Sequence, residues 1–248
     1  MKQKGAPPSL GYLEIMKINR DLLKHPNLVP FYGCFILYYI LYRPFVDYPP
    51  LTLMAVLFKC LPIWSLVYYI KATTQGPQWY RKPFLPDDYY CQNIIVGLLC
   101  SSVGDALLLS RVTLFIFGLL AFAVAHVFYN IAMGPAPLQT KNRDLYILGG
   151  MVCFLVIQEG IDSFIMKGLV LMYISLIFSV GWRATSRYQY YKTDALLYGS
   201  IGGLIFIFSD LIIAVDKWRF GIPASQFLVM TSYYTGQLGI ALSCTPPK

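Results

Sequence analysis

The feature that most constrains this chain is a series of apolar runs, each of about the length that crosses a lipid bilayer. A membrane-spanning helix needs roughly 20 predominantly apolar residues, with a range of about 17–25. We predict eight such spans, at residues 27–42, 51–70, 91–109, 114–133, 145–158, 168–183, 195–215 and 224–243. The run at 145–158 is the shortest of them. The sequence therefore predicts an all-α fold, a polytopic membrane bundle of eight transmembrane helices.

The composition supports a membrane protein over a soluble one. Hydrophobic residues make up 57% of the chain and charged residues only 13%, whereas a soluble domain carries about 25% charged residues. The joints between spans contain Pro and Gly, as in "GPAP" at 134–137, and are too short for a second folded domain. We expect a cytosolic segment at 1–26, one transmembrane domain at 27–243 and a cytosolic tail at 244–248. The first 27 residues lack the apolar core of a cleavable signal peptide.

The positive charges predict an orientation. The net charge is +8, but Lys and Arg lie mostly in short segments between apolar runs, so we expect no nucleic-acid partner. The side that holds both termini carries fourteen of these residues and the other side five, with Lys59 inside a span. Cytosolic loops are enriched in Lys and Arg. Both termini are therefore expected in the cytosol.

Cysteine and histidine offer no sign of a metal centre. The six cysteines are scattered without a CxxC spacing, and the only histidines are His25 and His126. Zinc sites and disulfide frameworks need clustered or regularly spaced ligands. We expect neither of them here.

Two aspartates stand in segments that otherwise belong in lipid. Asp105 lies in "GLLCSSVGDALLL" (97–109) and Asp210 in "GLIFIFSDLIIAV" (203–215). A carboxylate at the centre of a membrane helix costs about 2.5–3.5 kcal/mol on insertion scales. A chain that carries this cost twice is expected to use both groups.

The two aspartates also suggest an internal repeat. When Asp105 is aligned with Asp210, Gly97 falls on Gly202, and the pair Phe128–Tyr129 falls on Tyr233–Tyr234. Two four-helix halves would then be related by a twofold axis along the membrane normal. This arrangement predicts that the two carboxyl groups lie at similar depth and converge.

Other polar side chains in the spans are further candidates. Lys59 lies mid-helix in "VLFKCLP". Two pairs of polar residues are each three residues apart and therefore share a helix face: His126 with Tyr129, and Tyr234 with Gln237. Such residues usually turn toward the bundle interior. Singly, each has a structural alternative, because Tyr and Gln often only join helices by hydrogen bonds and Lys can snorkel to the interface. The glycine-rich "GSIGG" at 199–203 can pack against another helix or another protomer.

Paired carboxylates in a dry site suit one kind of chemistry. One group keeps its proton and acts as an acid, while the other stays anionic and stabilises positive charge or activates water. Glycoside hydrolases use such a pair around an oxocarbenium-like transition state. A membrane enzyme with this pair would suit a lipid bond that breaks through an oxocarbenium ion, such as a vinyl ether. Buried acids with a Lys also mark proton-coupled transporters, and a non-catalytic lipid-binding protein is a third reading.

Several short motifs occur together in one order. They are "KCLP" (59–62), "GD.LL" (104–108), "GL.AF..AH..Y" (118–129), "WRA" (182–184), "SDLI.AV" (209–215) and "YY.GQ" (233–237). With them the chain resembles the lysoplasmalogenase family of YhhN-like membrane proteins, from about residue 51 to 241. The resemblance implies an eight-helix membrane hydrolase without a metal or organic cofactor, located in the endoplasmic reticulum in animals or in the cell membrane in bacteria. Its substrate would be a lysoplasmalogen, whose vinyl ether bond is cleaved to a fatty aldehyde and glycerophosphoethanolamine or glycerophosphocholine.

The resemblance also implies roles for individual residues. The acid/base pair maps onto Asp105 and Asp210. The substrate-binding positions map onto Lys59, His126, Tyr129, Tyr234 and Gln237. One departure is Gly236, where the family often has Ala; it affects only a packing position.

Overall fold

The computed structural model describes residues 20–44, 49–110 and 113–246. Three parts of the sequence-based expectations lie outside these residues. They are positions 1–19 of the predicted cytosolic segment, Arg111 among the counted charges, and the last two residues of the predicted tail. Within the described ranges the chain forms α-helices, short 3-10 turns and connecting segments, with no β-strand.

Each predicted span corresponds to one α-helix, in the same order. The helices are α1 (Val29–Tyr42), α2 (Leu53–Gln75), α3 (Tyr89–Leu107), α4 (Phe115–Met133), α5 (Thr140–Ile157), α6 (Phe164–Tyr191), α7 (Asp194–Trp218) and α8 (Ser225–Leu242). The all-α prediction is confirmed. By length and composition, α2, α4, α6 and α7 are able to cross a membrane. Helix α1 has only 14 residues, and α3, α5 and α8 carry more polar residues, so the prediction of eight spans is supported for four.

Four helices begin at a side chain that caps them. The side-chain oxygen of each cap accepts a hydrogen bond from the backbone N–H three residues later, which satisfies a donor that the helix leaves open. The caps are Thr52 for α2, Asp88 for α3, Ser163 for α6 and Thr193 for α7. The second and third helices of each predicted half therefore start in the same way.

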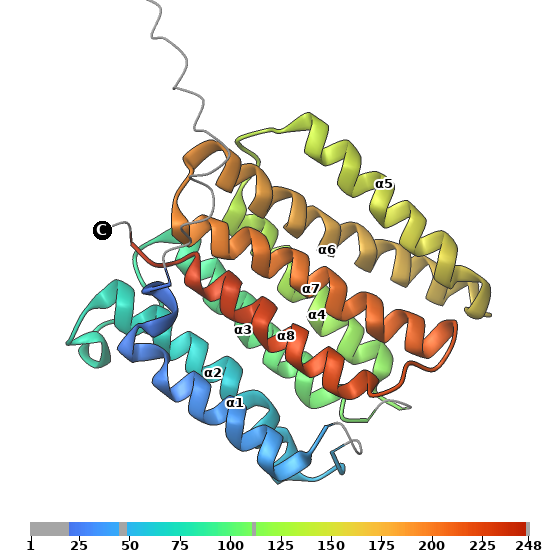
Figure 1. The fold of residues 1–248 in the computed structure, drawn as a ribbon, viewed down its shortest axis with the longest axis horizontal. Coiled ribbons are helices and arrows are strands. Elements are labelled where there is room, and N and C mark those ends of the chain that lie inside the picture. The colour runs from blue at the N-terminus through green and yellow to red at the C-terminus, as the bar shows by residue number, and fades with distance from the viewer. Residues whose placement is uncertain (1–19, 45–48, 111–112, 247–248) are drawn as a thin grey trace, which may run out of the picture.

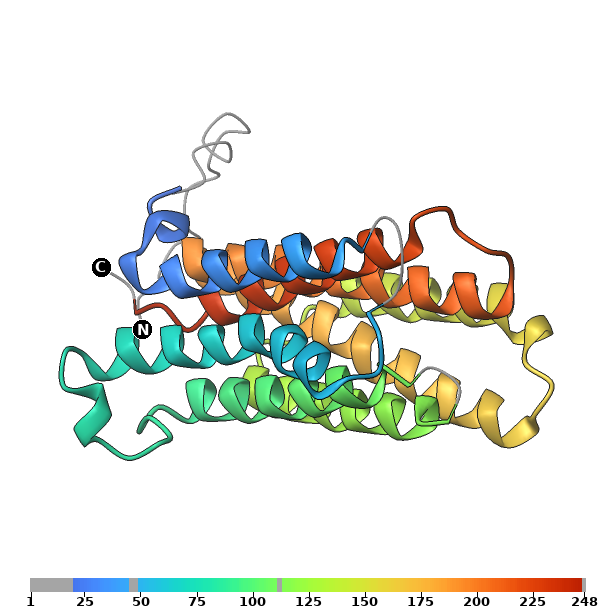
Figure 2. The same cartoon turned by 90° about the horizontal axis from the view of Figure 1, so that it is seen from below.

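The helices form a bundle with the predicted halves on either side. Helices α1 and α2 lie at one edge, α5 and α6 at the opposite edge, and α3, α4, α7 and α8 between them (Figures 1 and 2). The packing pairs α1–α2, α2–α3 and α3–α4 have counterparts in α5–α6, α6–α7 and α7–α8. The halves meet through α2–α8 and through α4–α6. This is the pattern that a twofold relation predicts. One difference is that α5 also packs against α7, whereas α1 and α3, the corresponding helices, make no contact of similar extent in the described parts of the chain.

The glycine-rich stretch at 199–203 packs inside this chain. A Cβ atom on Gly202 would lie 2.6 Å from the Gly236 carbonyl oxygen and 2.8 Å from Gly239 Cα, both in α8. Gly203 faces α6, where Gly181 Cα is 3.5 Å from its ideal Cβ position. Small residues let the backbones of membrane helices approach closely. Helix α7 thereby sits directly against α6 and α8, which sets its rotation and the direction of its side chains.

We predict that Gly202→Ala destabilises the bundle by about 1–3 kcal/mol, because the methyl group would overlap backbone atoms of α8 that cannot move alone. Thermal unfolding in detergent measures this. The matched control is Gly168→Ala in α6, since no atom lies within 4 Å of that Cβ position; it should not lower the melting temperature. Equal stability of the two variants would contradict the close approach of α7 and α8.

Candidate active site

A cavity of about 310 Å³ lies within the bundle and is bordered by α3, α4, α5, α6, α7 and α8, with α2 contributing one side chain. Most of its wall consists of Leu, Ile and Phe side chains. A few polar groups project from this apolar wall. They include Lys59, Asp105, Tyr173, Asp210 and Tyr233. An apolar chamber with a few converging polar groups is the usual form of a site for an apolar ligand.

Both aspartates reach this one chamber. Each is the seventeenth residue of its helix, counted from Tyr89 in α3 and from Asp194 in α7. The side chain of Asp105 is 3% exposed, whereas that of Asp210 is 15% exposed. The alignment of the two segments predicts this convergence. Whether the pair is catalytic stays a prediction.

Asp105 lies in a network of charged and hydroxyl groups. The Tyr233 hydroxyl donates to Asp105 Oδ2 at 2.6 Å. Lys59 Nζ lies 3.6 Å from Asp105 Oδ1 and donates to the Asp105 backbone oxygen at 3.0 Å. The Tyr234 hydroxyl donates to the Lys59 carbonyl oxygen at 2.8 Å. Lys59 therefore does not snorkel, and its ammonium is the buried counter-charge of Asp105.

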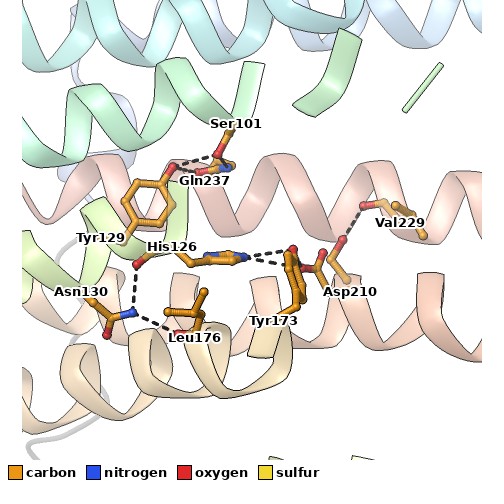
Figure 3. Close-up of polar contacts among 10 residues, drawn as sticks. Ser101, His126, Tyr129, Asn130, Tyr173, Leu176, Asp210, Val229 and Gln237 are labelled. Atoms are coloured by element: carbon orange, nitrogen blue, oxygen red, sulfur yellow. Dashed lines mark hydrogen bonds and ion pairs between the residues drawn. The ribbon is translucent and has the colours of Figure 1, made fainter. Parts of the chain in front are cut away.

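Asp210 has different partners. The Tyr173 hydroxyl donates to Asp210 Oδ2, and His126 Nε2 lies 3.1 Å from the same hydroxyl and 3.8 Å from Oδ2 (Figure 3). The His126 ring is fully buried and packs against Phe206, with centroids 5.0 Å apart. Asp210, Tyr173 and His126 thus form a compact group of three polar side chains from three helices.

The two aspartates have neighbours on corresponding helices but with different chemistry. Asp105 on α3 is contacted from α2 by Lys59 and from α8 by Tyr233. Asp210 on α7 is contacted from α6 by Tyr173 and from α4 by His126. Exchange of the two halves maps α2 onto α6 and α8 onto α4. One carboxyl group consequently faces an ammonium and a phenol, and the other a phenol and an imidazole.

Tyr129 and Gln237 belong to a closed group of hydrogen bonds with Ser101. The Tyr129 hydroxyl donates to Gln237 Oε1 at 2.8 Å, and Gln237 Nε2 donates to Ser101 Oγ at 3.1 Å (Figure 3). The Ser101 and Tyr129 hydroxyls are 3.3 Å apart. All three side chains are fully buried. The group joins α3, α4 and α8 one helical turn before Asp105.

The seven predicted residues therefore divide into two sets. The structure brings Lys59, Asp105 and Asp210 to the cavity wall. The other four predicted residues do not line the cavity among the described residues and lie behind its wall; they are His126, Tyr129, Tyr234 and Gln237. Within the described ranges, no three His, Cys, Asp or Glu side chains gather as metal ligands.

Sequence reasoning missed Tyr173 and Tyr233 as site residues. In the sequence, Tyr233 stands out only because the pair Tyr233–Tyr234 aligns with Phe128–Tyr129 in the internal repeat. Tyr173 is the only aromatic residue of "LMYISL", in the middle of an apolar run, and that was an available signal. With 20 tyrosines in the chain, however, most of which suit interfacial or packing positions, the signal is weak.

The chamber belongs to one end of the bundle. Its lining residues come from positions 105–109 of α3 and the loop after it, 115–122 of α4, 153–157 of α5, 170–178 of α6, 207–218 of α7 and 226–233 of α8, with Pro49 and Lys59 from the start of α2 and the loop before it. Helix directions alternate along the chain, so all of these segments lie toward the same end. On the other side of the aspartates stands the Ser101, Tyr129 and Gln237 group. The described lining therefore forms a pocket reached from one end and not a path between two faces.

These features together define an integral membrane protein with a buried acidic chamber. The profile of the YhhN family matches residues 54–244. The chain belongs to the YhhN family, as the motifs in the sequence indicate.

The chain is similar over most of its length to proteins named lysoplasmalogenase. It is 36% identical over 228 residues to lysoplasmalogenase TMEM86A of Homo sapiens and 34% identical over 228 residues to that of Bos taurus, in each case over 90% of both chains. It is 32% identical over 219 residues to lysoplasmalogenase TMEM86B of Homo sapiens, over 87% of this chain and 85% of the relative. No solved structure matches the chain.

We predict that Gln237→Leu lowers stability by about 1–3 kcal/mol, because it leaves the buried Tyr129 and Ser101 hydroxyls short of a partner. Gln189→Leu is the matched control. Gln189 is exposed and accepts a hydrogen bond from Asn142 at the surface, so its loss should change stability little. Thermal unfolding in detergent compares the two, and equal melting temperatures would count against the buried group as a structural tie.

Proposed function

We propose that this chain is a lysoplasmalogenase, a membrane hydrolase that cleaves the vinyl ether bond of lysoplasmalogens. Its products would be a fatty aldehyde and glycerophosphoethanolamine or glycerophosphocholine. The named relatives support the activity, since they align with nearly the whole chain. The observation that carries the mechanism is the meeting of two carboxyl groups on one apolar chamber.

The reaction is a hydration followed by a bond cleavage. A proton adds to the vinyl carbon distant from the ether oxygen, which leaves an oxocarbenium ion. Water adds to this cation and loses a proton, so a hemiacetal forms. The hemiacetal then collapses, the bond to the glycerol oxygen breaks, and an alcohol and an aldehyde leave. One water is consumed and the proton is returned, so two groups that donate and accept protons are sufficient.

The partners of the two aspartates support an assignment of roles. Asp105 acts as the anion that stabilises the oxocarbenium ion and activates water, since the Lys59 ammonium supplies the counter-charge that a buried carboxylate requires. Asp210 acts as the proton donor. Its nearest basic neighbour is the His126 imidazole, linked through the Tyr173 hydroxyl. This group offers a route by which the proton on Asp210 is replaced.

The remaining predicted residues act as positioning residues in this proposal. The Tyr129–Gln237–Ser101 group holds α3 against α4 and α8 one turn before Asp105. Tyr234 anchors the backbone of Lys59. His126 orients Tyr173 and, through it, the Asp210 carboxyl group. Such supporting contacts matter because catalytic groups must be held within fractions of an ångström of their working geometry.

The shape of the chamber favours a hydrolase over a proton-coupled transporter. A transporter needs a polar path that reaches both aqueous faces in turn, whereas the described lining is apolar and belongs to one end of the bundle. An apolar, one-ended pocket suits the single hydrocarbon chain of a lysolipid. We place the protein in the endoplasmic reticulum membrane with both termini cytosolic, so that the chamber would open toward the lumenal side.

We predict that Asp105→Asn and Asp210→Asn each lower aldehyde release from a lysoplasmalogen by about 10²–10⁴-fold, the usual contribution of a positioned acid or base. Purified protein in detergent is assayed for aldehyde. Asp162→Asn, at an exposed position between α5 and α6, controls for the loss of a carboxylate and should retain activity. Retained activity in a folded Asp105 or Asp210 variant would remove that residue from the chemistry.

We also predict that Lys59→Met lowers kcat by about 10²–10³-fold, as expected for the loss of a group that organises charge in a dry site. The control is Lys71→Met in the same helix. Lys71 is equally buried, but its ammonium lies over the Phe84 ring at 4.7 Å and not beside an aspartate of the chamber. If both variants lost activity to the same extent, the effect would come from a general disturbance of α2.

A further inference from the structure

The rim of the chamber carries a lysine that the reaction scheme does not use. Lys217 lies in the last turn of α7, is exposed, and lines the cavity together with Asp210 and Ala214. These three residues have the spacing i, i+4 and i+7, so they follow one face of the helix. Seven residues correspond to a rise of about 10 Å. Lys217 therefore stands above Asp210 on the same wall, toward the open end.

The surroundings of Lys217 resemble a shallow binding platform. Its Nζ lies 4.2 Å from the centre of the Phe115 ring, and Phe115 packs edge-on against Trp218 at 5.7 Å. Lys217 forms no ion pair with a carboxylate in the described parts of the chain. Asp216 lines the same rim and accepts a hydrogen bond from the Ile222 N–H at 2.8 Å. The rim thus offers an exposed cation without an ion pair among the described residues, an aromatic surface and a neighbouring carboxylate.

Lys59 is poorly suited to bind a substrate phosphate. Its ammonium is buried and already contacts both the carboxylate and the backbone oxygen of Asp105. A phosphate brought there would compete with Asp105 and would enter the driest part of the chamber. Lys217, by contrast, meets water at the rim, where an anionic head group retains part of its hydration. Of the two lysines on the cavity wall, the exposed one has the better position for a phosphate.

We propose that Lys217 binds the phosphate group of the lysolipid substrate and so fixes the direction in which the substrate enters. The proposal rests on the proposed function. The head group lies at the rim, the alkenyl chain lies among the deeper apolar side chains such as Ile177 and Ile207, and the vinyl ether bond lies between them near Asp105 and Asp210. A glycerol unit joins the ether oxygen to the phosphate, and the flexible stem of Lys217 lets its ammonium reach back toward it.

The rim also suits a zwitterionic head group. The carboxylate of Asp216 lies next in sequence to the ammonium of Lys217, and both line the cavity. A phosphate on Lys217 would leave the ammonium of an ethanolamine or choline group close to Asp216 and to the aromatic rings of Phe115 and Trp218. Aromatic faces attract such cations. The site therefore recognises the phosphate by charge and tolerates either amine.

The test compares two substrates with the same alkenyl chain. One is a lysoplasmalogen, and the other is an alkenylglycerol that lacks the phosphate group. Lys217→Met should raise KM for the lysoplasmalogen roughly tenfold, which is the order of a hydrogen bond to a charged group, with kcat little changed. The KM for the alkenylglycerol should stay the same. Lys217→Arg should preserve most of the binding, because the charge is kept.

Lys167→Met is the matched control, since Lys167 lies at the start of α6 at the same end of the bundle and does not line the cavity. It should leave both KM values unchanged. An unchanged KM for the lysoplasmalogen in Lys217→Met would overturn the proposal. Equal losses on both substrates would overturn it as well, because Lys217 would then act on something other than the phosphate.

A binding measurement separates this inference from the proposed function. A saturated alkyl ether lysolipid carries the same head group and has no vinyl ether bond to cleave. Its binding to the full chain in detergent is followed by tryptophan fluorescence, since Trp218 lies at the rim. Lys217→Met should weaken binding of this lysolipid roughly tenfold and leave binding of the corresponding alkylglycerol unchanged. If the wild type binds the alkyl ether lysolipid more tightly than Lys217→Met does but releases no aldehyde from a lysoplasmalogen, only the proposed hydrolysis fails. If the wild type and the variant bind this lysolipid equally, the role of Lys217 is overturned.

Discussion

The buried contact between Lys59 and Asp105 is the interaction on which the rest of the chamber depends. A charge in an apolar interior persists only with a partner, and removal of one member of a buried pair costs about 3–5 kcal/mol. Here the pair ties α2 to α3, with Nζ 3.6 Å from the carboxylate. Tyr233 and Tyr234 of α8 then add hydroxyl donors to the carboxylate and to the Lys59 backbone. Three helices are thereby held in one relative position by groups of which Lys59, Asp105 and Tyr233 also line the cavity.

The near-symmetry of the bundle explains how one chamber holds two carboxyl groups with different properties. Corresponding helices place Asp105 and Asp210 at the same position from their helix starts and surround each with side chains from corresponding neighbours. Symmetry of the backbone does not extend to these side chains. Lys59 on one side and His126 on the other make the two environments unequal. Acid/base chemistry needs such a difference, because two equivalent carboxyl groups would compete for the same role.

Several hydroxyl and amide groups hold the helices around the chamber in place without lining it. Tyr129, Gln237 and Ser101 are hydrogen-bonded to one another, so each of their polar side-chain atoms has a partner although the group is buried. Their place one turn from Asp105 links the packing of the bundle to the geometry of the site. The rim is built differently: Lys217 and Asp216 lie where water reaches them. In the proposed function, the rigid contacts would surround the reacting bond and the hydrated contacts would meet the head group of the lysolipid.

The sequence alone determined the all-helical class, the order of the eight helices and the polar residues that apolar segments would not otherwise carry. These follow from local hydropathy and from side-chain chemistry near each position, and the ordered motifs pointed to the family. Only the tertiary structure decided that Tyr233, 128 residues from Asp105 in sequence, is its hydrogen-bond donor, that Tyr173 serves Asp210, and that Tyr129 and Gln237 stand behind the wall. The physical reason is that such pairings depend on how each helix is rotated about its axis. Close backbone contacts such as that of Gly202 with α8 set this rotation, and no local pattern in a single sequence records it.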